Sequence, residues 1–110
     1  MKIEKIPVFE RETALRIFLE ELKVPAESRS VPLLCCVILS RAENADKPLQ
    51  RLLEETAAAF RMHPDQVYRG IRHLILTAWA NDGIAERMST EQFITYAAAW
   101  LLDAETAFRK

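Results

Sequence analysis

Two arginines three positions apart, Arg69 and Arg72, have the clearest chemical potential in this sequence. They lie in the segment from Val67 to Trp79, and at about 100° per residue they fall on the polar side of an amphipathic helix. An arginine guanidinium can donate two parallel hydrogen bonds to O6 and N7 of guanine, and a glutamine such as Gln66 can pair in the same bidentate way with adenine. The pattern therefore indicates a helix that presents hydrogen-bonding side chains to the DNA major groove.

Further side chains of this helix, and of the turn before it, extend the candidate DNA surface. Tyr68 lies toward one edge and could contact a thymine methyl group, a sugar or a phosphate. Asp65 lies on the outward side near the positive end of the helix dipole. Arg61 and His63 in the turn are expected to help at the phosphate backbone. The candidate DNA-binding residues are Arg61, His63, Asp65, Gln66, Tyr68, Arg69, Arg72 and His73.

The elements that must position these residues are helices. Apolar periodicity and capping signals predict helices at about 10–22, 30–42, 48–60, 64–81 and 89–109. Ser30 is the expected N-cap of the second helix, and Ser89 with Gln92 forms a capping box at the start of the last. The second helix is apolar nearly all round, so we expect it to be the most buried. The prediction is an all-α, compact bundle of about five helices, with residues 1–9 as an extended N-terminal arm and residues 10–110 as a single domain.

The third and fourth predicted helices are separated by a short turn, as in a helix-turn-helix. Ala57 is small at the point where the two helices would cross, and Phe60 and Val67 are spaced to pack across the turn. Arg61 occupies a turn position where many such motifs have glycine, so the turn need not be of the most regular kind. The predicted core-facing residues of the fourth helix are Val67, Ile71, Leu74, Ile75 and Ala78.

The composition fits one globular domain. Half of the 110 residues are hydrophobic, and 15 basic against 16 acidic residues give a net charge of −1. Many DNA-binding domains are basic overall, so this balance argues against DNA binding unless the basic residues gather on one face. Residues 1–9 lack the apolar run of a secretory signal, and the longest apolar stretch, 31–39, is too short to cross a bilayer. Cys35 and Cys36 in that stretch are expected to be buried thiols in a reducing cytoplasm.

Nothing in the sequence indicates catalysis. His63 and His73 are isolated, and the two cysteines lack partners for a zinc site. The sequence has no glycine-rich phosphate loop and no serine in a recognisable nucleophile context. We therefore expect a protein that is not an enzyme and needs no cofactor, metal, small-molecule substrate or membrane.

A protein–protein interaction module that kept the fold and lost DNA binding is the alternative. The balanced charge and the acidic first and third helices favour it. Tyr68 and an outward Leu76 on the fourth helix favour it as well. Binding to random duplex DNA across salt concentrations would separate the two hypotheses.

The segment from Val67 to Trp79 also resembles the recognition helix of a known family, the C-terminal effector domains of the sporulation master response regulator (sporulation stage zero protein A). That family shows Val-x-Arg-x-Ile-Arg-His followed by an apolar run into Ala-Trp. The matching residues here are Val67, Arg69, Ile71, Arg72, His73, Ala78 and Trp79. The segments 22–26 and 89–94 are similar to the family's flanking segments, so the resemblance covers about residues 10–108.

The resemblance implies a cytoplasmic transcriptional regulator that binds a short promoter element in double-stranded DNA, as a homodimer or as tandem copies, with Arg69 and Arg72 facing the DNA. The family offers arginine where this chain has Gln66 and glutamate where it has Tyr68, so the preferred bases are expected to differ. The connection 83–88 is shorter than the family's, in a region that contacts the transcription machinery. With 110 residues there is no room for the family's receiver domain, so we expect a stand-alone effector domain.

Overall fold

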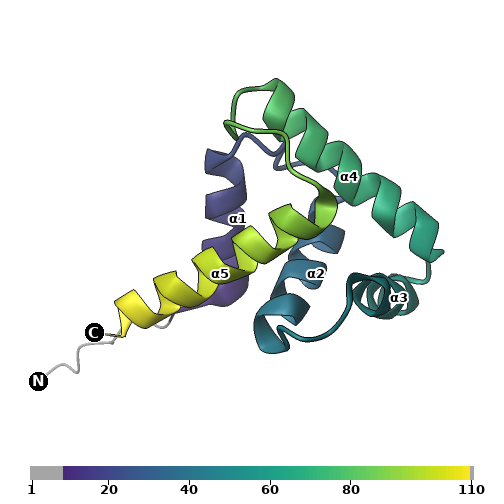
Figure 1. Cartoon of the computed structure of the whole chain (residues 1–110), viewed down its shortest axis with the longest axis horizontal. Coiled ribbons are helices and arrows are strands. Elements are labelled where there is room, and N and C mark those ends of the chain that lie inside the picture. Colours follow the sequence, from purple (N-terminus) through teal and green to yellow (C-terminus); the bar gives the residue numbers. More distant parts are fainter. Residues whose placement is uncertain (1–8, 110) are drawn as a thin grey trace, which may run out of the picture.

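The computed structural model describes residues 9–109, and these form five α-helices (Figure 1). The helices are α1 (Arg11–Glu21), α2 (Val31–Glu43), α3 (Leu49–Phe60), α4 (Pro64–Ala80) and α5 (Thr90–Phe108). No strand occurs between residues 9 and 109, so the predicted all-α bundle of about five helices is confirmed. Of the predicted N-terminal arm, only Phe9 lies within the described residues.

Helix α2 is the centre of the bundle. It packs against each of the other four helices, most extensively against α5, which crosses it in Figure 1. Leu34, Val37 and Ile38 of α2 have no exposed surface, and neither have Phe93 and Ile94 of α5. Burying one such side chain is worth about 1.5–3 kcal/mol relative to leaving it in water. The apolar character of residues 31–39 therefore reflects a helix enclosed by protein, as the sequence predicts.

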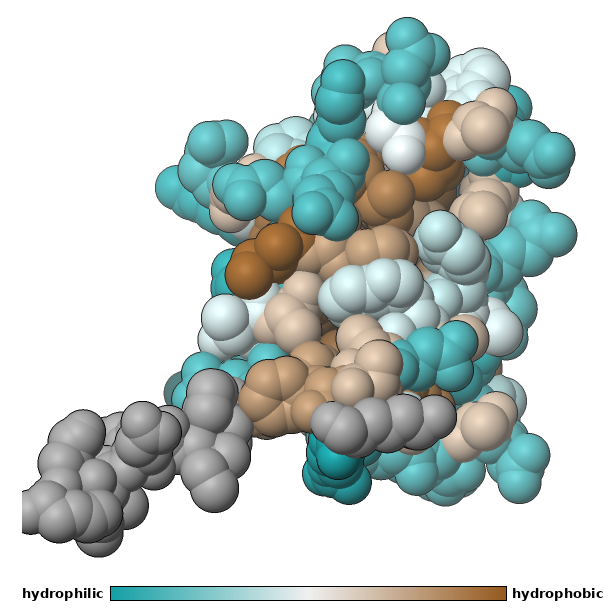
Figure 2. Space-filling model, turned by 90° about the vertical axis from the view of Figure 1, so that its left-hand side faces the viewer, coloured by the Kyte–Doolittle hydropathy of each residue, from teal (hydrophilic) through white to brown (hydrophobic). Residues whose placement is uncertain are grey.

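The α1–α5 contact is aromatic and leaves apolar surface exposed. Phe18 stacks on Trp100, with ring centroids 4.1 Å apart, and its ring centroid lies 5.9 Å from that of Tyr96. Ile17 and Tyr96 remain about half exposed. Figure 2 views the molecule from the side on which α1 lies in Figure 1, and it shows apolar residues in the middle of this face between hydrophilic ones.

The start of α2 differs from the prediction. Ser30 has helical backbone angles, and its side chain makes no capping hydrogen bond. Instead, the Ser30 amide donates to the hydroxyl of Ser28 at 3.2 Å. The Ser30 hydroxyl lies against α4, where a Cβ added at Gly70 would be 2.5 Å from it. The missing side chain at Gly70 thus lets the start of α2 approach α4 closely.

Three helices end in the same left-handed turn, and in none of them is the left-handed residue a glycine. Lys23, Arg61 and Asp82 have φ angles of 65°, 56° and 61°. After each of them, the next amide donates to the carbonyl five residues back, as in a Schellman motif: Val24 to Leu19, Met62 to Ala57, and Gly83 to Ala78. A side chain in this conformation costs about 1–2 kcal/mol, so residue type alone does not reveal these turns.

Gly83 follows α4 directly after Asp82, where a glycine often adopts the left-handed conformation that ends a helix, but its role here is different. The left-handed residue after α4 is Asp82, whereas φ at Gly83 is not positive. A Cβ at Gly83 would lie only 1.7 Å from the carbonyl oxygen of Leu22. The backbones at the ends of α1 and α4 therefore touch, and only a residue without a side chain fits between them.

Two phenylalanines at helix ends lie at the surface, including Phe60, which was expected to pack with Val67. Phe60 is 41 % exposed, so it is not part of the core that encloses Val67. It borders a hollow beside Pro32 and Cys36 of α2. Phe108 is 46 % exposed, with its ring centroid 5.5 Å from that of Phe9. Each phenylalanine ends its helix, where fewer neighbouring elements remain to cover an apolar ring.

Candidate nucleic-acid interface

Helix α4 has one buried face and one exposed face, divided as the periodicity predicts. The buried residues are Val67, Ile71, Leu74, Ile75 and Ala78. The exposed residues of the first half of the helix are Asp65, Gln66, Tyr68, Arg69, Arg72 and His73. The buried face fixes the rotation of α4 about its own axis, so it also fixes the direction in which the arginines point.

The turn between α3 and α4 fixes where α4 begins. Arg61 adopts the left-handed conformation that glycine would adopt more easily, and the Met62 amide donates to the Ala57 carbonyl at 2.8 Å. Thr56 and Ala57 near the end of α3 are buried, and the Thr56 hydroxyl donates to Cys36 Sγ of α2 at 3.5 Å. This end of α3 is therefore held against α2. The exposed Arg61 side chain stands directly before α4.

His63 and Gln66 cap the start of α4. The His63 amide donates to Gln66 Oε1 at 2.9 Å, and the Asp65 amide donates to His63 Nδ1 at 3.2 Å. Because Nδ1 accepts a hydrogen bond, the proton of the neutral imidazole is assigned to Nε2. The predicted bidentate contact of Gln66 with adenine needs the same Oε1 atom. Gln66 would have to share this oxygen between the cap and the base, a constraint on its orientation that the sequence analysis missed.

The other candidates come together on the exposed side of α4. Tyr68, Arg69, Arg72 and His73 line one shallow hollow together with Leu76, and we call these five residues the α4 surface. Tyr68 is 38 % exposed, and Leu76 is half-buried between this hollow and a neighbouring one. The eight predicted residues thus lie on the turn and on the first half of α4. They form two groups, the turn and cap before and at its start, and the α4 surface one turn further on.

The arginines around α4 have no carboxylate partners among residues 9–109. Elsewhere in this part of the chain the ion pairs of basic side chains other than histidine are Arg11–Glu105, Arg16–Glu12, Arg41–Glu91, Lys47–Glu55 and Arg109–Glu105. None of these pairs involves Arg61, Arg69 or Arg72. Helix α4 itself carries a single acidic residue, Asp65, at its start. None of these three arginines is therefore held in an ion pair by the residues that the structure describes.

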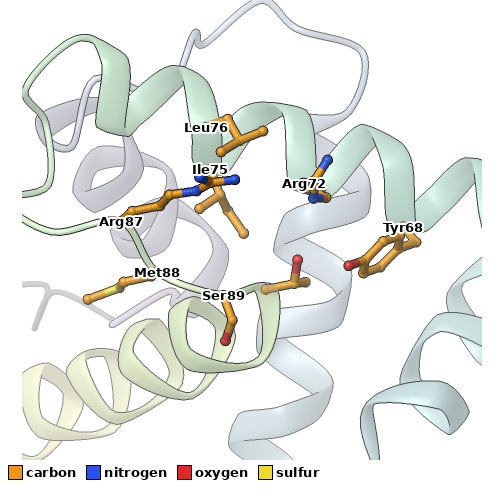
Figure 3. A pocket seen from close by; sticks show the side chains of 8 residues that line it. Tyr68, Arg72, Ile75, Leu76, Arg87, Met88 and Ser89 are labelled. Atoms are coloured by element: carbon orange, nitrogen blue, oxygen red, sulfur yellow. The ribbon is translucent and has the colours of Figure 1, made fainter.

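Arg87 adds a basic residue that the sequence analysis did not single out. It is exposed in the connection between α4 and α5, and it lines a pocket with Tyr68 and Arg72 (Figure 3). Nothing in the sequence pattern marks this residue, because its position depends on the path of residues 81–89.

The two cysteines and the acidic residues do not form a second site. Burial raises the pKa of the Cys35 thiol to about 11, so this thiol is not an activated nucleophile. Between residues 9 and 109, no three His, Cys, Asp or Glu side chains gather as a metal site would require. In the same range, no helix is both long and apolar enough to cross a membrane.

Comparisons of the chain with protein families, with curated proteins and with solved structures found no match. The resemblance to the effector domain of the sporulation regulator therefore stays a prediction that depends on the residues of α4.

Proposed function

We propose that this protein binds double-stranded DNA and regulates transcription, with α3, the turn and α4 acting as a helix-turn-helix whose second helix enters the major groove. One observation carries the proposal. The first half of α4 exposes Arg69 and Arg72 side by side with no carboxylate partner among residues 9–109. In the helix-turn-helix, the outward residues in the first turns of the second helix contact the base edges.

The residues of the α4 surface and of the cap then take different roles. Arg69 and Arg72 contact bases or nearby phosphates, and Tyr68 and His73 border them. Arg61 contacts the phosphate backbone from the turn. His63 and Gln66 hold the start of α4 in shape, and the Nε2–H of His63 is free to donate to a phosphate. The Asp65 carboxylate interacts favourably with the positive end of the helix dipole, and it repels phosphates from neighbouring positions.

A single α4 makes few base contacts, so useful affinity is expected to require a second copy, either as a homodimer or as neighbouring copies on the DNA. Membership of the sporulation effector family would be consistent with such an arrangement. A cytoplasmic role in a spore-forming bacterium, and contacts with the transcription machinery, belong to the same proposal.

The test begins with selection of a preferred duplex from random sequences, followed by fluorescence anisotropy on that duplex and on a random one. Arg69→Ala is expected to weaken binding to the preferred duplex by about 10- to 100-fold, the equivalent of about 1–3 kcal/mol, with a much smaller loss on the random duplex. The matched control is Arg16→Ala, which removes an exposed arginine of α1 that is paired with Glu12. Equal losses on both duplexes would remove the base-reading role of Arg69. Failure of the wild-type protein to bind any duplex at low salt would overturn the proposal.

A protein–protein interaction module remains the second candidate, because Tyr68 and Leu76 place apolar surface among the arginines. It would be supported by a lack of DNA binding together with a protein partner whose binding protects Tyr68 and Leu76 from solvent.

A further inference from the structure

A pocket of about 350 Å³ lies between α4 and the start of α5. Tyr68, Arg72, Ile75 and Leu76 line it from α4, and Arg87, Met88, Ser89 and Thr90 line it from the opposite side. Figure 3 shows the Arg87 side chain extending from the connection toward α4 and the Tyr68 hydroxyl pointing into the space between the two helices. The pocket is thus built by two elements that are separate in the sequence.

The charge of the pocket is positive. Arg72 and Arg87 are both exposed, and neither forms an ion pair or a side-chain hydrogen bond with residues 9–109. No carboxylate belongs to the pocket lining. Two arginines that border one hollow repel each other, so an anion between them would be stabilised by both.

Hydrogen-bond donors add to this charge. Thr90 is only 7 % exposed and lines the pocket, and its hydroxyl has no hydrogen-bond partner among the described residues. The capping box of α5 uses the amides of Ser89 and Gln92, which leaves the amides of Thr90 and Glu91 without intrahelical acceptors. The Thr90 hydroxyl faces the solvent-filled pocket without a protein partner, so it is available to donate to a polar ligand there.

We propose that this pocket binds a phosphate group and, resting on the proposed function, that the phosphate belongs to the DNA backbone beside the groove that α4 enters. Two guanidinium groups, a hydroxyl and the positive end of a helix are the donors that a phosphate oxygen prefers. The pocket shares Tyr68, Arg72 and Leu76 with the α4 surface, so one DNA strand can lie across both. Arg87 is then a backbone contact that adds affinity without reading sequence.

The test uses the whole chain and duplexes in which single phosphates are replaced by neutral methylphosphonates. We expect Arg87→Ala to weaken binding about five- to tenfold on preferred and random duplexes alike, and to reduce the slope of log affinity against log salt by about 0.9. Replacing one particular phosphate by methylphosphonate should weaken DNA binding by the wild-type protein by a similar factor and leave binding by Arg87→Ala unchanged. Arg109→Ala, which removes an exposed arginine at the far end of α5, should keep the wild-type pattern.

The outcomes separate this inference from DNA binding itself. If the wild type binds DNA and Arg87→Ala stays as sensitive as the wild type to every methylphosphonate, the pocket is not a phosphate contact, whereas the proposed function stands. If the wild type binds no DNA, inorganic phosphate is titrated while the amide signals of Thr90 and Glu91 are followed by NMR. Chemical-shift changes that disappear in Arg87→Ala would show that the pocket binds phosphate, and they would overturn the assignment of that phosphate to DNA. Shifts with a polyglutamate peptide but none with phosphate would overturn the pocket in favour of an acidic protein partner.

Discussion

The arginine between α2 and α5, Arg41, and the arginines of α4 have opposite surroundings. The Arg41 side chain is 7 % exposed and donates to Glu91 at 2.7 Å, to the Thr95 hydroxyl at 2.8 Å and to the Lys47 carbonyl at 3.2 Å. Arg69 and Arg72 are exposed and donate to no described residue. The same residue type thus joins helices where a carboxylate faces it, and it remains available to a partner where none does.

The contrast extends along the molecule. Arg11 joins α1 to α5 through Glu105 at 2.8 Å, and this hydrogen bond lowers the pKa of the Glu105 carboxyl. Arg61 in the turn before α4 and Arg87 in the connection after it have no such partners among residues 9–109. If the ion-paired arginines of α1, α2 and α5 serve only stability and the unpaired arginines around α4 serve binding, changes to the first group should alter stability alone. Removal of charge from the second group should alter binding.

Removal of Glu91 is expected to have the largest effect on stability. Glu91→Ala leaves the buried Arg41 charge without its carboxylate, and we expect the free energy of unfolding to fall by about 2 kcal/mol. Arg41→Met removes the buried charge itself and fills much of the same space, and the half-exposed Glu91 carboxylate that remains can be solvated by water. This substitution should cost under about 1 kcal/mol, helped by the removal of the Arg41 Nε–H, which has no hydrogen-bond partner. Urea denaturation checks both variants, and a larger loss for Arg41→Met would contradict the account.

Acid should weaken the same contact. The hydrogen bond from Arg41 lowers the pKa of Glu91 below its usual value, so its contribution is complete above the unfolded pKa of about 4.3 and is lost as the pH falls through the folded pKa. Because the Glu91 side chain is half exposed, solvent screening limits this contribution to about 1 kcal/mol. Stability curves of the wild type and of Glu91→Gln should therefore converge at low pH. Curves that stay parallel would show that the carboxylate charge plays no part.

Arg61→Gly should change stability and binding in opposite directions. Glycine adopts the left-handed conformation without strain, so we expect stability to rise by about 0.5–1 kcal/mol. The loss of a backbone contact should weaken binding to every duplex by a similar factor and reduce its salt dependence. Lys23→Gly is the matched control, because it relieves the same conformation at the end of α1 and should leave DNA affinity unchanged. Thermal unfolding and fluorescence anisotropy measure the two effects.

Arg16→Ala should have the smallest effect. Its partner Glu12 lies one turn earlier on the same helix, and both side chains are largely exposed. Such pairs contribute about 0.3–0.5 kcal/mol, so thermal unfolding should change little and DNA affinity should not change. A tenfold loss of affinity in Arg16→Ala would mean that α1 also contacts DNA, and the comparison between the two regions would fail.

The helices and their buried faces could be predicted because they follow from the spacing of apolar residues. The buried face of α4 was found residue by residue in this way. Capping depends instead on backbone angles, and these follow from how the loops pack. Ser30 has a typical capping side chain without capping, whereas His63 caps without being a typical residue for it.

The candidate site was predicted in part for the same reason. The exposed positions of Arg69 and Arg72 follow from helical periodicity alone. The engagement of Gln66 in the cap depends on the turn, and the place of Arg87 beside Arg72 depends on the path between α4 and α5. Contacts across a loop leave no periodic trace in a sequence.

Helix α4 is held at its beginning by the turn after α3, at its middle by Ser30 against Gly70, and at its end by Leu22 against Gly83. These three contacts fix the orientation of α4 within the domain, so α4 can change its tilt only together with α1 and α2. If α4 enters a DNA groove, little adjustment is expected from the protein, so sequences that deform at low cost would be preferred even at base pairs that no side chain touches.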